Sequence, residues 1–168
     1  MDLRKNLSPA IFAYDGIQYQ YMSPQVFEES YLEYIETHLR IISGLYGILK
    51  PFDGITPYRL EMQAKLKTNF CRNLYDYWKD KIYLELTKDN SVILNLASNE
   101  YSKTVTKYMS SDVRLVTCIF GELIDGKVKE KGVYVKMARG EMVRYMAENS
   151  IRDIEKIKGF DRLGFAYS

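Results

Sequence analysis

A run of chain-turning residues before the middle of the sequence constrains the fold more than any other feature. Gly44 and Gly47 allow a tight turn or a close backbone contact, Pro51 stops a helix, and Asp53-Gly54 turns the chain again. No long helix is compatible with this spacing. It predicts instead a short buried strand over residues 39–42.

Residues 57–62 follow this run and alternate as a second strand would, with Arg59 and Glu61 on one side. An arginine and a glutamate paired beside so many turns indicate either a functional site or a well-ordered connection with a structural ion pair. The spacing alone leaves both interpretations open.

The remaining sequence alternates short apolar runs with amphipathic ones. We expect further strands over 11–14, 91–97 and 164–167, helices over 24–37, 73–88, 98–108 and 138–149, and a β-hairpin in which 113–124 and 127–137 flank an Asp125-Gly126 turn. Strands that alternate with helices predict a mixed α/β (α+β) fold. We expect one domain over residues 1–168, with a mixed sheet flanked by helices and one β-hairpin.

The composition is that of an ordinary globular protein and argues against several other classes. No run approaches the roughly 18 apolar residues that span a bilayer, so no membrane partner is expected, and the first residues do not resemble a signal peptide. Cys71 and Cys118 both lie in apolar surroundings. This favours reduced thiols in a cytoplasmic protein, and neither a disulfide nor a peroxide-sensing pair.

Sequence motifs for common enzyme chemistries are missing. The chain has no glycine-rich dinucleotide fingerprint, phosphate-binding P-loop, zinc-ligand spacing or nucleophile elbow. Ser98, Tyr101 and Lys103 invite comparison with dehydrogenases, but a tyrosine and a lysine two positions apart lie on different helix faces. The single histidine, His38, is predicted at a helix end and provides no metal-ligand set. We therefore assign no catalytic residue, metal or cofactor.

Basic residues dominate the segment from Tyr101 to Arg144, where nine lysines and arginines face five acidic residues. In a helix over 138–149, Arg139 would lie in the first turn, where the helix dipole disfavours a cation. Such a position favours an anion that Arg139 and the free helix N–H groups hold together. The alternative is a solvated arginine without a ligand.

Polar residues follow three predicted strands, and ligands gather at the carboxyl ends of strands in open α/β sheets. These groups are Ser43 with Gly44, Asn95 with the segment 98–103, and Lys136 with Arg139. We expect Arg59, Asn95, Lys136 and Arg139 to converge within one cleft.

Four strings of residues resemble the YaaA family of bacterial peroxide-stress proteins. They are Leu-Arg-Ile-Ile-Ser-Gly-Leu-Tyr-Gly-Ile-Leu-Lys-Pro-Phe-Asp (39–53), Pro-Tyr-Arg-Leu-Glu-Met (57–62), Asn-Leu-Ala-Ser-Asn-Glu-Tyr (95–101) and Lys-Met-Ala-Arg-Gly (136–140). The strings occur in order and with compatible spacing across nearly the whole chain. Family members are longer at both ends, so the chain resembles a truncated member that lacks the N-terminal segment and the C-terminal end.

The resemblance implies a cytoplasmic protein of the hydroperoxide response, on the family's own mixed α/β fold, that limits iron-driven damage. It also implies binding of double-stranded DNA through a positive cleft and a helix-hairpin-helix, which we expect in the N-terminal segment. The cations that match the family motifs and would line the cleft are Arg59, Lys103, Lys136, Arg139 and Arg144. The polar residues expected in the cleft are Ser43, Tyr46, Tyr58, Glu61, Asn95, Ser98, Glu100 and Tyr101.

Three functions are compatible with these residues. A DNA-binding stress protein would contact duplex phosphates with little base readout and strong salt dependence. An uncharacterised enzyme or binding protein for a small phosphorylated or anionic ligand would use the same cleft, because Glu61 and Glu100 would repel a DNA backbone. The third function is a buried ion-pair network that only stabilises the fold. An open pocket would favour the second, and a broad basic groove the first.

Overall fold

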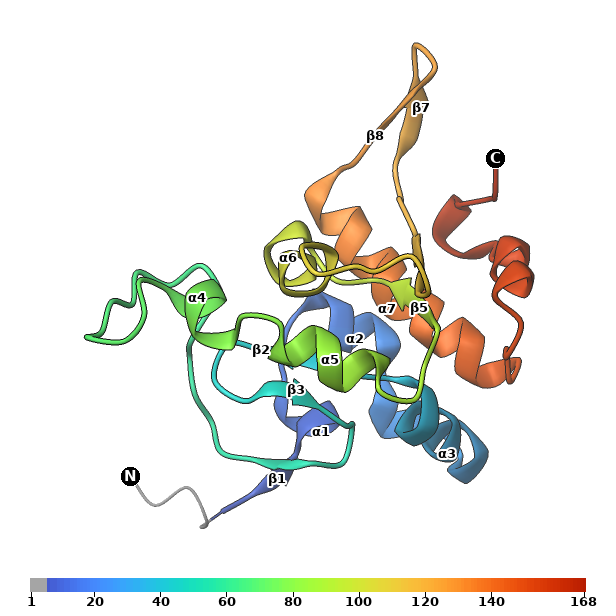
Figure 1. Ribbon diagram of the computed structural model, residues 1–168. Helices are drawn as coiled ribbons and strands as arrows, with labels where there is room; N and C mark the ends of the chain where they lie inside the picture. The colour runs from blue at the N-terminus through green and yellow to red at the C-terminus, as the bar shows by residue number, and fades with distance from the viewer. Residues whose placement is uncertain (1–5) are drawn as a thin grey trace. The chain divides into compact units, whose positions relative to one another are not determined.

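The computed structural model describes residues 6–168 (Figure 1). The chain forms two compact units, each assembled from separate segments of the sequence. Unit 1 contains the residues up to Leu39 together with Pro51–Thr56 and Cys118–Ser168. Unit 2 contains Arg40–Lys50 and Pro57–Thr117. The chain therefore enters unit 2 twice before it returns to unit 1 at Cys118.

Unit 1 is mainly helical. Its helices are α1 (Ala10–Ala13), α2 (Ile17–Met22), α3 (Glu29–His38) and α7 (Gly132–Glu148), with 3₁₀ turns η1 (Pro24–Val26), η2 (Ile154–Gly159) and η3 (Arg162–Gly164). Its strands form two antiparallel pairs, one from β1 (Ser8–Pro9) and β4 (Gly54–Ile55), the other from β7 (Glu122–Ile124) and β8 (Lys127–Lys129).

The packing of α2 against α7 centres on Gly140. A Cβ atom at this position would collide with the backbone carbonyl of Gln18 and would lie 2.9 Å from the backbone nitrogen of Met22. Met22, Ala138 and Gly140 are all buried. Glycine thus allows the two helices to approach backbone to backbone, and this contact fixes how α7 lies in unit 1.

The C-terminal segment of unit 1 is tied to α7 by ion pairs. Arg162 donates from Nη1 to Glu141 at 3.1 Å and from Nη2 to Glu148, while Arg144 Nε donates to Glu148 at 2.7 Å. The Arg162 guanidinium also lies over the Tyr145 ring, 5.4 Å from its centroid. Burial opposes ionisation of Glu148, but the hydrogen bonds from the two arginines outweigh it and lower the pKa of the carboxyl.

Unit 2 combines two strand pairs with three short helices. β2 (Ile41–Ser43) and β3 (Gly47–Leu49) are antiparallel, whereas β5 (Val92–Asn95) and β6 (Arg114–Thr117) are parallel. The helices are α4 (Leu74–Trp78), α5 (Lys81–Thr87) and α6 (Asn99–Thr106). Because parallel strands need a crossover, α6 connects β5 to β6. The predicted mixed α/β class is confirmed, with the strands of residues 6–168 paired in four two-stranded sheets.

The two glycines of the β2–β3 turn both allow close contacts, as the sequence predicts. Gly44 faces the backbone carbonyl of Leu60, and Gly47, at φ +80°, lies against Trp78, whose ring carbon would be 2.7 Å from a Cβ atom. The Trp78 indole N–H also donates to the Gly44 carbonyl at 2.9 Å. Trp78 therefore holds this turn by packing and by a hydrogen bond.

The core of unit 2 lies between its helices and the chain after Pro57. Its buried side chains are Met62, Leu74, Ile82, Tyr83 and Val105. Full burial of such side chains stabilises a fold by about 1.5–3 kcal/mol each. Met62 is completely buried, so the segment before it is anchored to this core although it forms no strand.

Three strand predictions are wrong and one is too long. Residues 10–13 form α1, whose Ala10 and Ile11 N–H groups donate to the carbonyls of Asp53 and Pro51 at 2.9 and 2.8 Å. A run of four apolar residues cannot distinguish a strand from a buried helix. Segments 57–62 and 164–167 contain no strand, and the strand predicted over 91–97 is limited to β5 and begins at a half-exposed Val92.

The hairpin is confirmed at its turn but is shorter than predicted. Asp125 and Gly126 both have positive φ and join β7 to β8. β6 instead pairs with β5, and the residues after Lys129 form the start of α7. α7 therefore begins at Gly132, six residues before the predicted helix, which changes the environment of Arg139.

Two predicted helices are interrupted. Pro24 begins the short turn η1, and α3 begins only at Glu29, although it ends at His38 as expected. The helix predicted over 73–88 is broken at Lys79, whose φ is +49°, into α4 and α5. Asn73 caps α4 by accepting a hydrogen bond from the backbone N–H of Asp76 at 2.9 Å. Within residues 6–168, no helix is both long and apolar enough to cross a bilayer.

The glycine contact in α7 leads to a first prediction. Replacement of Gly140 by Ala should destabilise the chain by roughly 1–3 kcal/mol, because the new methyl group forces α2 and α7 apart. Gly132→Ala is the matched control, since it lies in the same helix and its Cβ would meet open space. The free energy of unfolding of the control should equal that of the unmodified chain or exceed it by up to about 1 kcal/mol. Urea unfolding measures both, and equal stability of the two variants would contradict the prediction.

The ion pairs of Glu148 predict an acid-sensitive contribution to stability. Because its folded-state pKa lies below the ordinary value of 4.5, the stabilisation is complete above that value and is lost as the pH falls through the lowered folded-state pKa. The free energy of unfolding of Glu148→Gln should therefore be lower than that of the unmodified chain at pH 6, and the difference should shrink in acid. Glu155→Gln, which removes a more exposed pair with Lys158, should show a smaller difference. A difference for Glu148→Gln that stays constant with pH would refute this assignment.

Candidate functional site

The predicted site residues are divided between the two units. Unit 2 contains Ser43, Tyr46, Tyr58, Arg59, Glu61, Asn95, Ser98, Glu100, Tyr101 and Lys103, and unit 1 contains Lys136, Arg139 and Arg144. The predicted convergence of Arg59 and Asn95 with Lys136 and Arg139 joins residues of different units, and it stays a prediction.

Ser43, Tyr46 and Tyr58 form one group in unit 2. Ser43 is buried at the end of β2, and its Oγ accepts from the backbone N–H groups of Leu45 and Tyr46 at 3.2 and 3.0 Å. The same hydroxyl forms a short hydrogen bond with the Tyr58 hydroxyl. The rings of Tyr46 and Tyr58 pack edge to face, with their centroids 5.4 Å apart. These contacts fix the conformation of the β2–β3 turn.

Glu100 and Tyr101, at the start of α6, face the chain around Met62. Glu100 Oε1 accepts from the backbone N–H of Gln63 at 3.0 Å, and its backbone carbonyl accepts from the Tyr75 hydroxyl at 2.8 Å. Burial raises the pKa of Tyr101, and the negative charge of Glu100 raises it further. Tyr101 is therefore protonated at neutral pH and can donate a hydrogen bond.

Arg59 and Glu61 form the ion pair that the sequence predicts, but the pair is exposed. Arg59 Nη2 lies 3.9 Å from Glu61 Oε1, with 92% and 66% of the two side chains accessible to solvent. A pair of this kind contributes at most about 1 kcal/mol. The hypothesis of a buried ion-pair network therefore does not describe these two residues, and Arg59 is accessible to an anionic ligand.

Asn95, Ser98 and Lys103 lie around the β5–α6 connection. Asn95 ends β5, accepts from the Ala97 N–H at 3.0 Å and donates to the Thr117 hydroxyl at 3.3 Å. Both the oxygen and the nitrogen of the Asn95 amide therefore have hydrogen-bond partners. Ser98 occupies the N-cap position of α6 but its side chain makes no capping hydrogen bond, and Lys103 is exposed on α6.

Arg139 lies in the middle of α7, not in its first turn, so the argument from an unfavourable helix dipole is wrong. It is the eighth residue of the helix, about 10 Å along the axis from Gly132. The side chain is half-buried, and its Nε is a buried donor without a hydrogen-bond partner among residues 6–168. Burial lowers the pKa of Arg139, and the charge of Glu130 opposes this effect.

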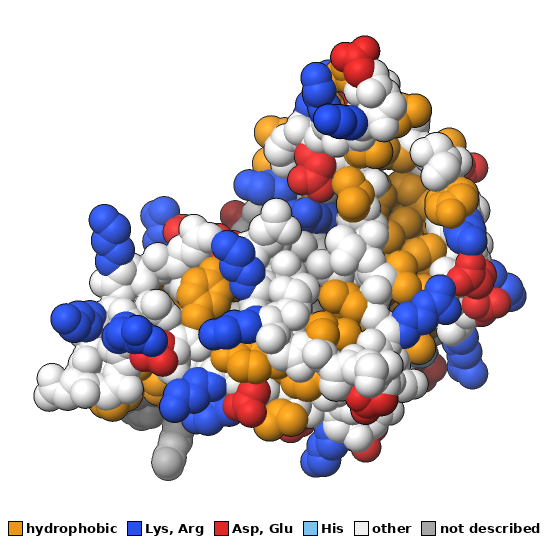
Figure 2. All heavy atoms as spheres, turned by 45° about the horizontal axis from the view of Figure 1, so that its top comes forward, with side chains coloured by type: hydrophobic (Ala, Val, Ile, Leu, Met, Phe, Trp, Pro, Cys, Tyr) orange, Lys and Arg blue, Asp and Glu red, His pale blue; other side chains and the backbone are white. Residues whose placement is uncertain are grey.

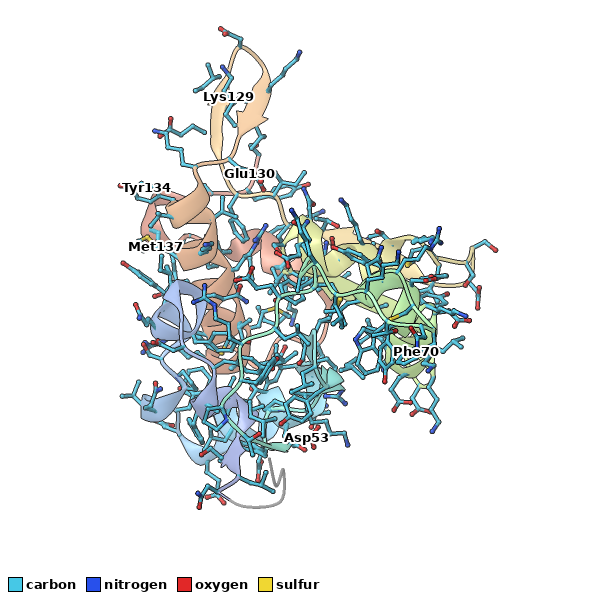
Figure 3. All side chains as sticks on the ribbon, turned by 90° about the vertical axis from the view of Figure 1, so that its left-hand side faces the viewer. Asp53, Phe70, Lys129, Glu130, Tyr134 and Met137 are labelled. Atoms are coloured by element: carbon cyan, nitrogen blue, oxygen red, sulfur yellow. The ribbon has the colours of Figure 1, made fainter. Side chains whose placement is uncertain are left out.

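The true start of α7 has the features that were expected at Arg139. The side chain of the N-cap residue, Lys131, makes no capping hydrogen bond, and no acidic residue lies in the first turn, so the backbone N–H groups of residues 132–134 have no partner within the helix. Lys129 ends β8, Lys131 precedes the helix and Lys136 lies in its second turn. Figure 3 shows Lys129 and Glu130 where β8 leads into α7, above Tyr134 and Met137. The sequence signal for this corner was Gly132 after a run of alternating lysines.

Arg144 has a different environment from Lys136 and Arg139. Its Nε–Glu148 hydrogen bond belongs to the ion-pair network of the C-terminal segment. That network lines a cavity of about 440 Å³ with Glu141, Glu148, Arg162 and Leu163. Two carboxylates balance the two guanidinium groups there, so this cavity does not favour an anion.

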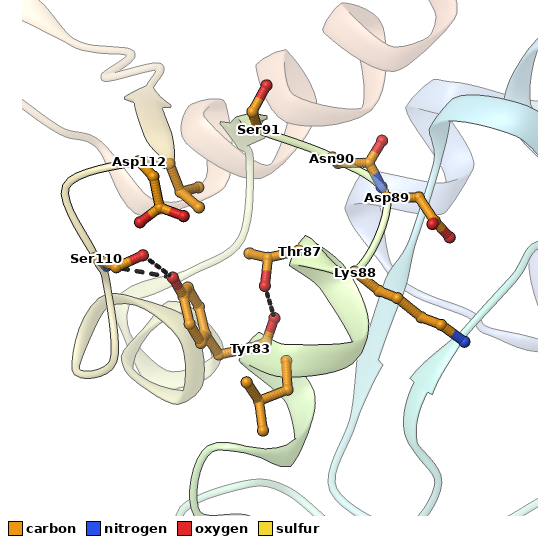
Figure 4. Close-up of a pocket in the computed structure, with 10 residues that line it drawn as sticks. Tyr83, Thr87, Lys88, Asp89, Asn90, Ser91, Ser110 and Asp112 are labelled. Atoms are coloured by element: carbon orange, nitrogen blue, oxygen red, sulfur yellow. Dashed lines mark hydrogen bonds between the residues drawn. The ribbon is translucent and has the colours of Figure 1, made fainter.

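A second cavity, of about 500 Å³, lies in unit 2 and contains none of the predicted site residues. It is formed by the end of α5, the chain before β5 and the chain before β6 (Figure 4). The Tyr83 hydroxyl bonds the Ser110 hydroxyl at 2.6 Å, and Thr87 donates to the Tyr83 carbonyl at 2.9 Å. Its polar groups are thus partly occupied by one another.

Side chains that could bind a metal are scattered. No group of three or more histidine, cysteine, aspartate or glutamate side chains in the described part of the chain could hold a metal ion. Cys71 and Cys118 are free thiols, and burial raises the pKa of Cys118 to about 11.

Comparison with known proteins identifies the family. A family model described as peroxide stress protein YaaA matches residues 1–168. The chain is 71% identical over 167 residues to a UPF0246 protein of Desulfitobacterium hafniense, and 58% and 56% identical to UPF0246 proteins of Lachnoclostridium phytofermentans and Pediococcus pentosaceus. Each alignment covers 99% of this chain and 66% of the relative, so the chain spans about two thirds of the length of these relatives. The chain therefore belongs to the YaaA family of peroxide stress proteins.

Proposed function

We propose that the chain binds the phosphate backbone of double-stranded DNA through β8 and the first half of α7, within the peroxide stress response. The observation that carries the proposal is the half-buried guanidinium of Arg139. Its Nε finds no acceptor among the side chains and backbone of residues 6–168. A donor left unsatisfied in this way costs about 1–3 kcal/mol, and more when it is charged.

A phosphate group supplies the acceptor that Arg139 lacks once the side chain turns its buried Nε toward solvent. Its oxygens accept hydrogen bonds from a guanidinium in a matching geometry, and its negative charge offsets the burial that lowers the Arg139 pKa. Lys136, one helical turn earlier on α7, is exposed and can contact the same or a neighbouring phosphate.

The start of α7 adds hydrogen-bond donors that can contact phosphate groups but do not recognise DNA bases. Backbone N–H groups at a helix N-terminus bind phosphate, and Lys129 and Lys131 add charge beside them. Lys131 is paired with Glu122 at 2.5 Å, but both side chains are more than half exposed, so this pair is weak and can be exchanged for a phosphate. Contacts of this kind position a protein on DNA without sequence specificity.

A small phosphorylated ligand is the second candidate, because Arg139 and the α7 N-terminus would suit a single phosphate as well. Selectivity for such a ligand would need further polar groups. Ser43, Tyr58 and Glu100 already form hydrogen bonds or ring contacts within unit 2, which supports the duplex as the first choice.

The salt dependence of binding tests the proposal. Replacement of both Lys136 and Arg139 by Ala should flatten the slope of log K against log salt by about two units, because each lost phosphate contact releases one counterion fewer. Fluorescence anisotropy with a labelled duplex measures the slope. Arg152→Ala/Lys156→Ala removes the same charge from exposed positions after α7 and should change the slope much less.

Two results would contradict this assignment. A slope that is unchanged in the Lys136/Arg139 double variant would exclude these residues from duplex binding. The small-ligand alternative would be favoured by two results in the same double variant. Duplex binding would be unchanged, and inorganic phosphate would no longer raise the temperature of thermal unfolding.

The Cys118 thiol should not act as the peroxide sensor of this chain. With a pKa of about 11, its thiolate fraction at neutral pH is about 100-fold below that of a thiol with a pKa of 9. Labelling of the intact chain with iodoacetamide at pH 7.5, read by mass spectrometry, should therefore be slow at Cys118. Labelling as fast as that of free cysteine would show that this half-buried thiol is activated.

A further inference from the structure

The segment 65–81, which we call the α4 arm, combines exposed aromatic rings with positive charge. It contains five basic and two acidic residues, a net charge of +3, whereas the whole chain carries +2. Lys65, Lys67, Arg72, Lys79 and Lys81 are all exposed. Figure 1 shows the arm as the loop that leads into α4, and Figure 2 shows basic side chains gathered over this part of unit 2, at the left of the view.

Phe70 is the most exposed large apolar side chain in the described part of the chain, at 76% (Figure 3). Its backbone is nevertheless held firmly. The Thr68 hydroxyl accepts from the N–H groups of Phe70 and Cys71 at 3.3 and 3.1 Å, and the Thr68 N–H donates to the Cys71 carbonyl at 2.9 Å. Cys71 is buried, so the turn is anchored beside the exposed ring. A fixed backbone presents Phe70 to solvent with little conformational freedom to lose on binding.

A second aromatic ring extends this surface. The centroid of the Tyr77 ring, which is 41% exposed, lies 6.2 Å from that of Phe70 at an interplanar angle of 52°, and 5.0 Å from that of Trp78 in an edge-to-face arrangement. The Lys81 ammonium lies 5.6 Å from the centre of the Tyr77 ring. Trp78 is in turn fixed by its hydrogen bond to Gly44. The arm thus carries one cation, Lys81, beside the Tyr77 ring of the Phe70–Tyr77 pair.

Asp76, one of the two acidic residues of the arm, has a local role. Asp76 accepts from the Arg72 backbone N–H at 3.0 Å and lies 3.5 Å from the Arg72 guanidinium, so one carboxylate is matched by one cation. The remaining lysines, two before Phe70 and two after Trp78, outnumber Asp80. The charge surplus therefore flanks the exposed rings on both sides along the chain.

We propose that the α4 arm binds single-stranded nucleic acid, with an unstacked base on the face of Phe70 and the backbone phosphates on Lys65, Lys67, Lys79 and Lys81. Aromatic rings between lysines are the arrangement that single strands prefer, because every base has a face that can stack and every linkage has a charge. A duplex keeps its base faces stacked inside and cannot use an exposed phenyl ring in this way. The site lies wholly within unit 2 and is independent of the duplex contacts proposed for α7.

Anisotropy with a labelled oligothymidylate of about 12 nucleotides tests the proposal on the whole chain. Phe70→Ala should weaken binding by roughly five-fold or more, Phe70→Tyr should retain it, and Phe70→Leu, which keeps apolar area without a ring, should resemble Ala. Lys67→Ala should reduce the salt slope by about 0.7, the value for one single-strand contact. Because Phe70 is exposed, thermal unfolding of Phe70→Ala should match that of the unmodified chain, which checks that the fold is retained.

The same variants separate this proposal from the duplex proposal. Phe70→Ala should leave the affinity for a matched duplex unchanged, and Lys136→Ala/Arg139→Ala should leave the affinity for the oligothymidylate unchanged. Oligothymidylate binding that is absent at about 50 mM salt, or that is equally tight in Phe70→Ala, would overturn the single-strand proposal and leave the duplex proposal standing.

Discussion

The contact between Trp78 and the β2–β3 turn is the constraint on which unit 2 depends. A hairpin with three residues in each strand is marginal by itself, so it needs packing from outside the sheet. The Trp78 ring supplies this packing against Gly47, and its N–H occupies the Gly44 carbonyl. Through Gly44 the turn also meets the backbone of Leu60, which holds the segment 57–62 in place. The backbone that carries Tyr58 and Arg59 is thus held next to the β2–β3 turn by the contact at Gly44.

The sequence predicts features whose cause lies within a few residues. The glycines of the β2–β3 turn, the Asp125-Gly126 turn and the helix end at His38 are of this kind. The start of α7 is not, because Val133, Tyr134 and Val135 have the high strand propensity of β-branched and aromatic residues. The packing of α7, in which Val135 is buried, overrides that propensity, and the helix begins at Gly132. The misplacement of this one helix end led to the wrong environment for Arg139.

The structure separates the predicted site residues into those that stabilise loops and those that remain accessible to a ligand. Ser43, Tyr58 and Glu100 are used to fix loops, whereas Arg59 and Lys103 are open to solvent and Arg139 retains an unsatisfied donor. Spacing alone could not separate these groups, because polar residues that stabilise a turn and polar residues that bind a ligand both follow strand ends. Burial and hydrogen-bond partners distinguish them, and these depend on contacts between residues far apart in the sequence.

The shape of the β7–β8 hairpin has a consequence for the kinetics of any ligand that meets this corner. All residues of its two strands are exposed, and in the described structure each strand pairs only with the other. Such a ribbon opens at little cost in free energy, so its amide hydrogens should exchange with solvent faster than those of α7. The corner therefore joins a soft element that carries Lys127 and Lys129 to a stiff one that carries Lys136 and Arg139. A polyanion would contact the lysines of the mobile hairpin first and would order the hairpin only when it also binds the helix. Part of the conformational entropy lost on binding would then come from the protein.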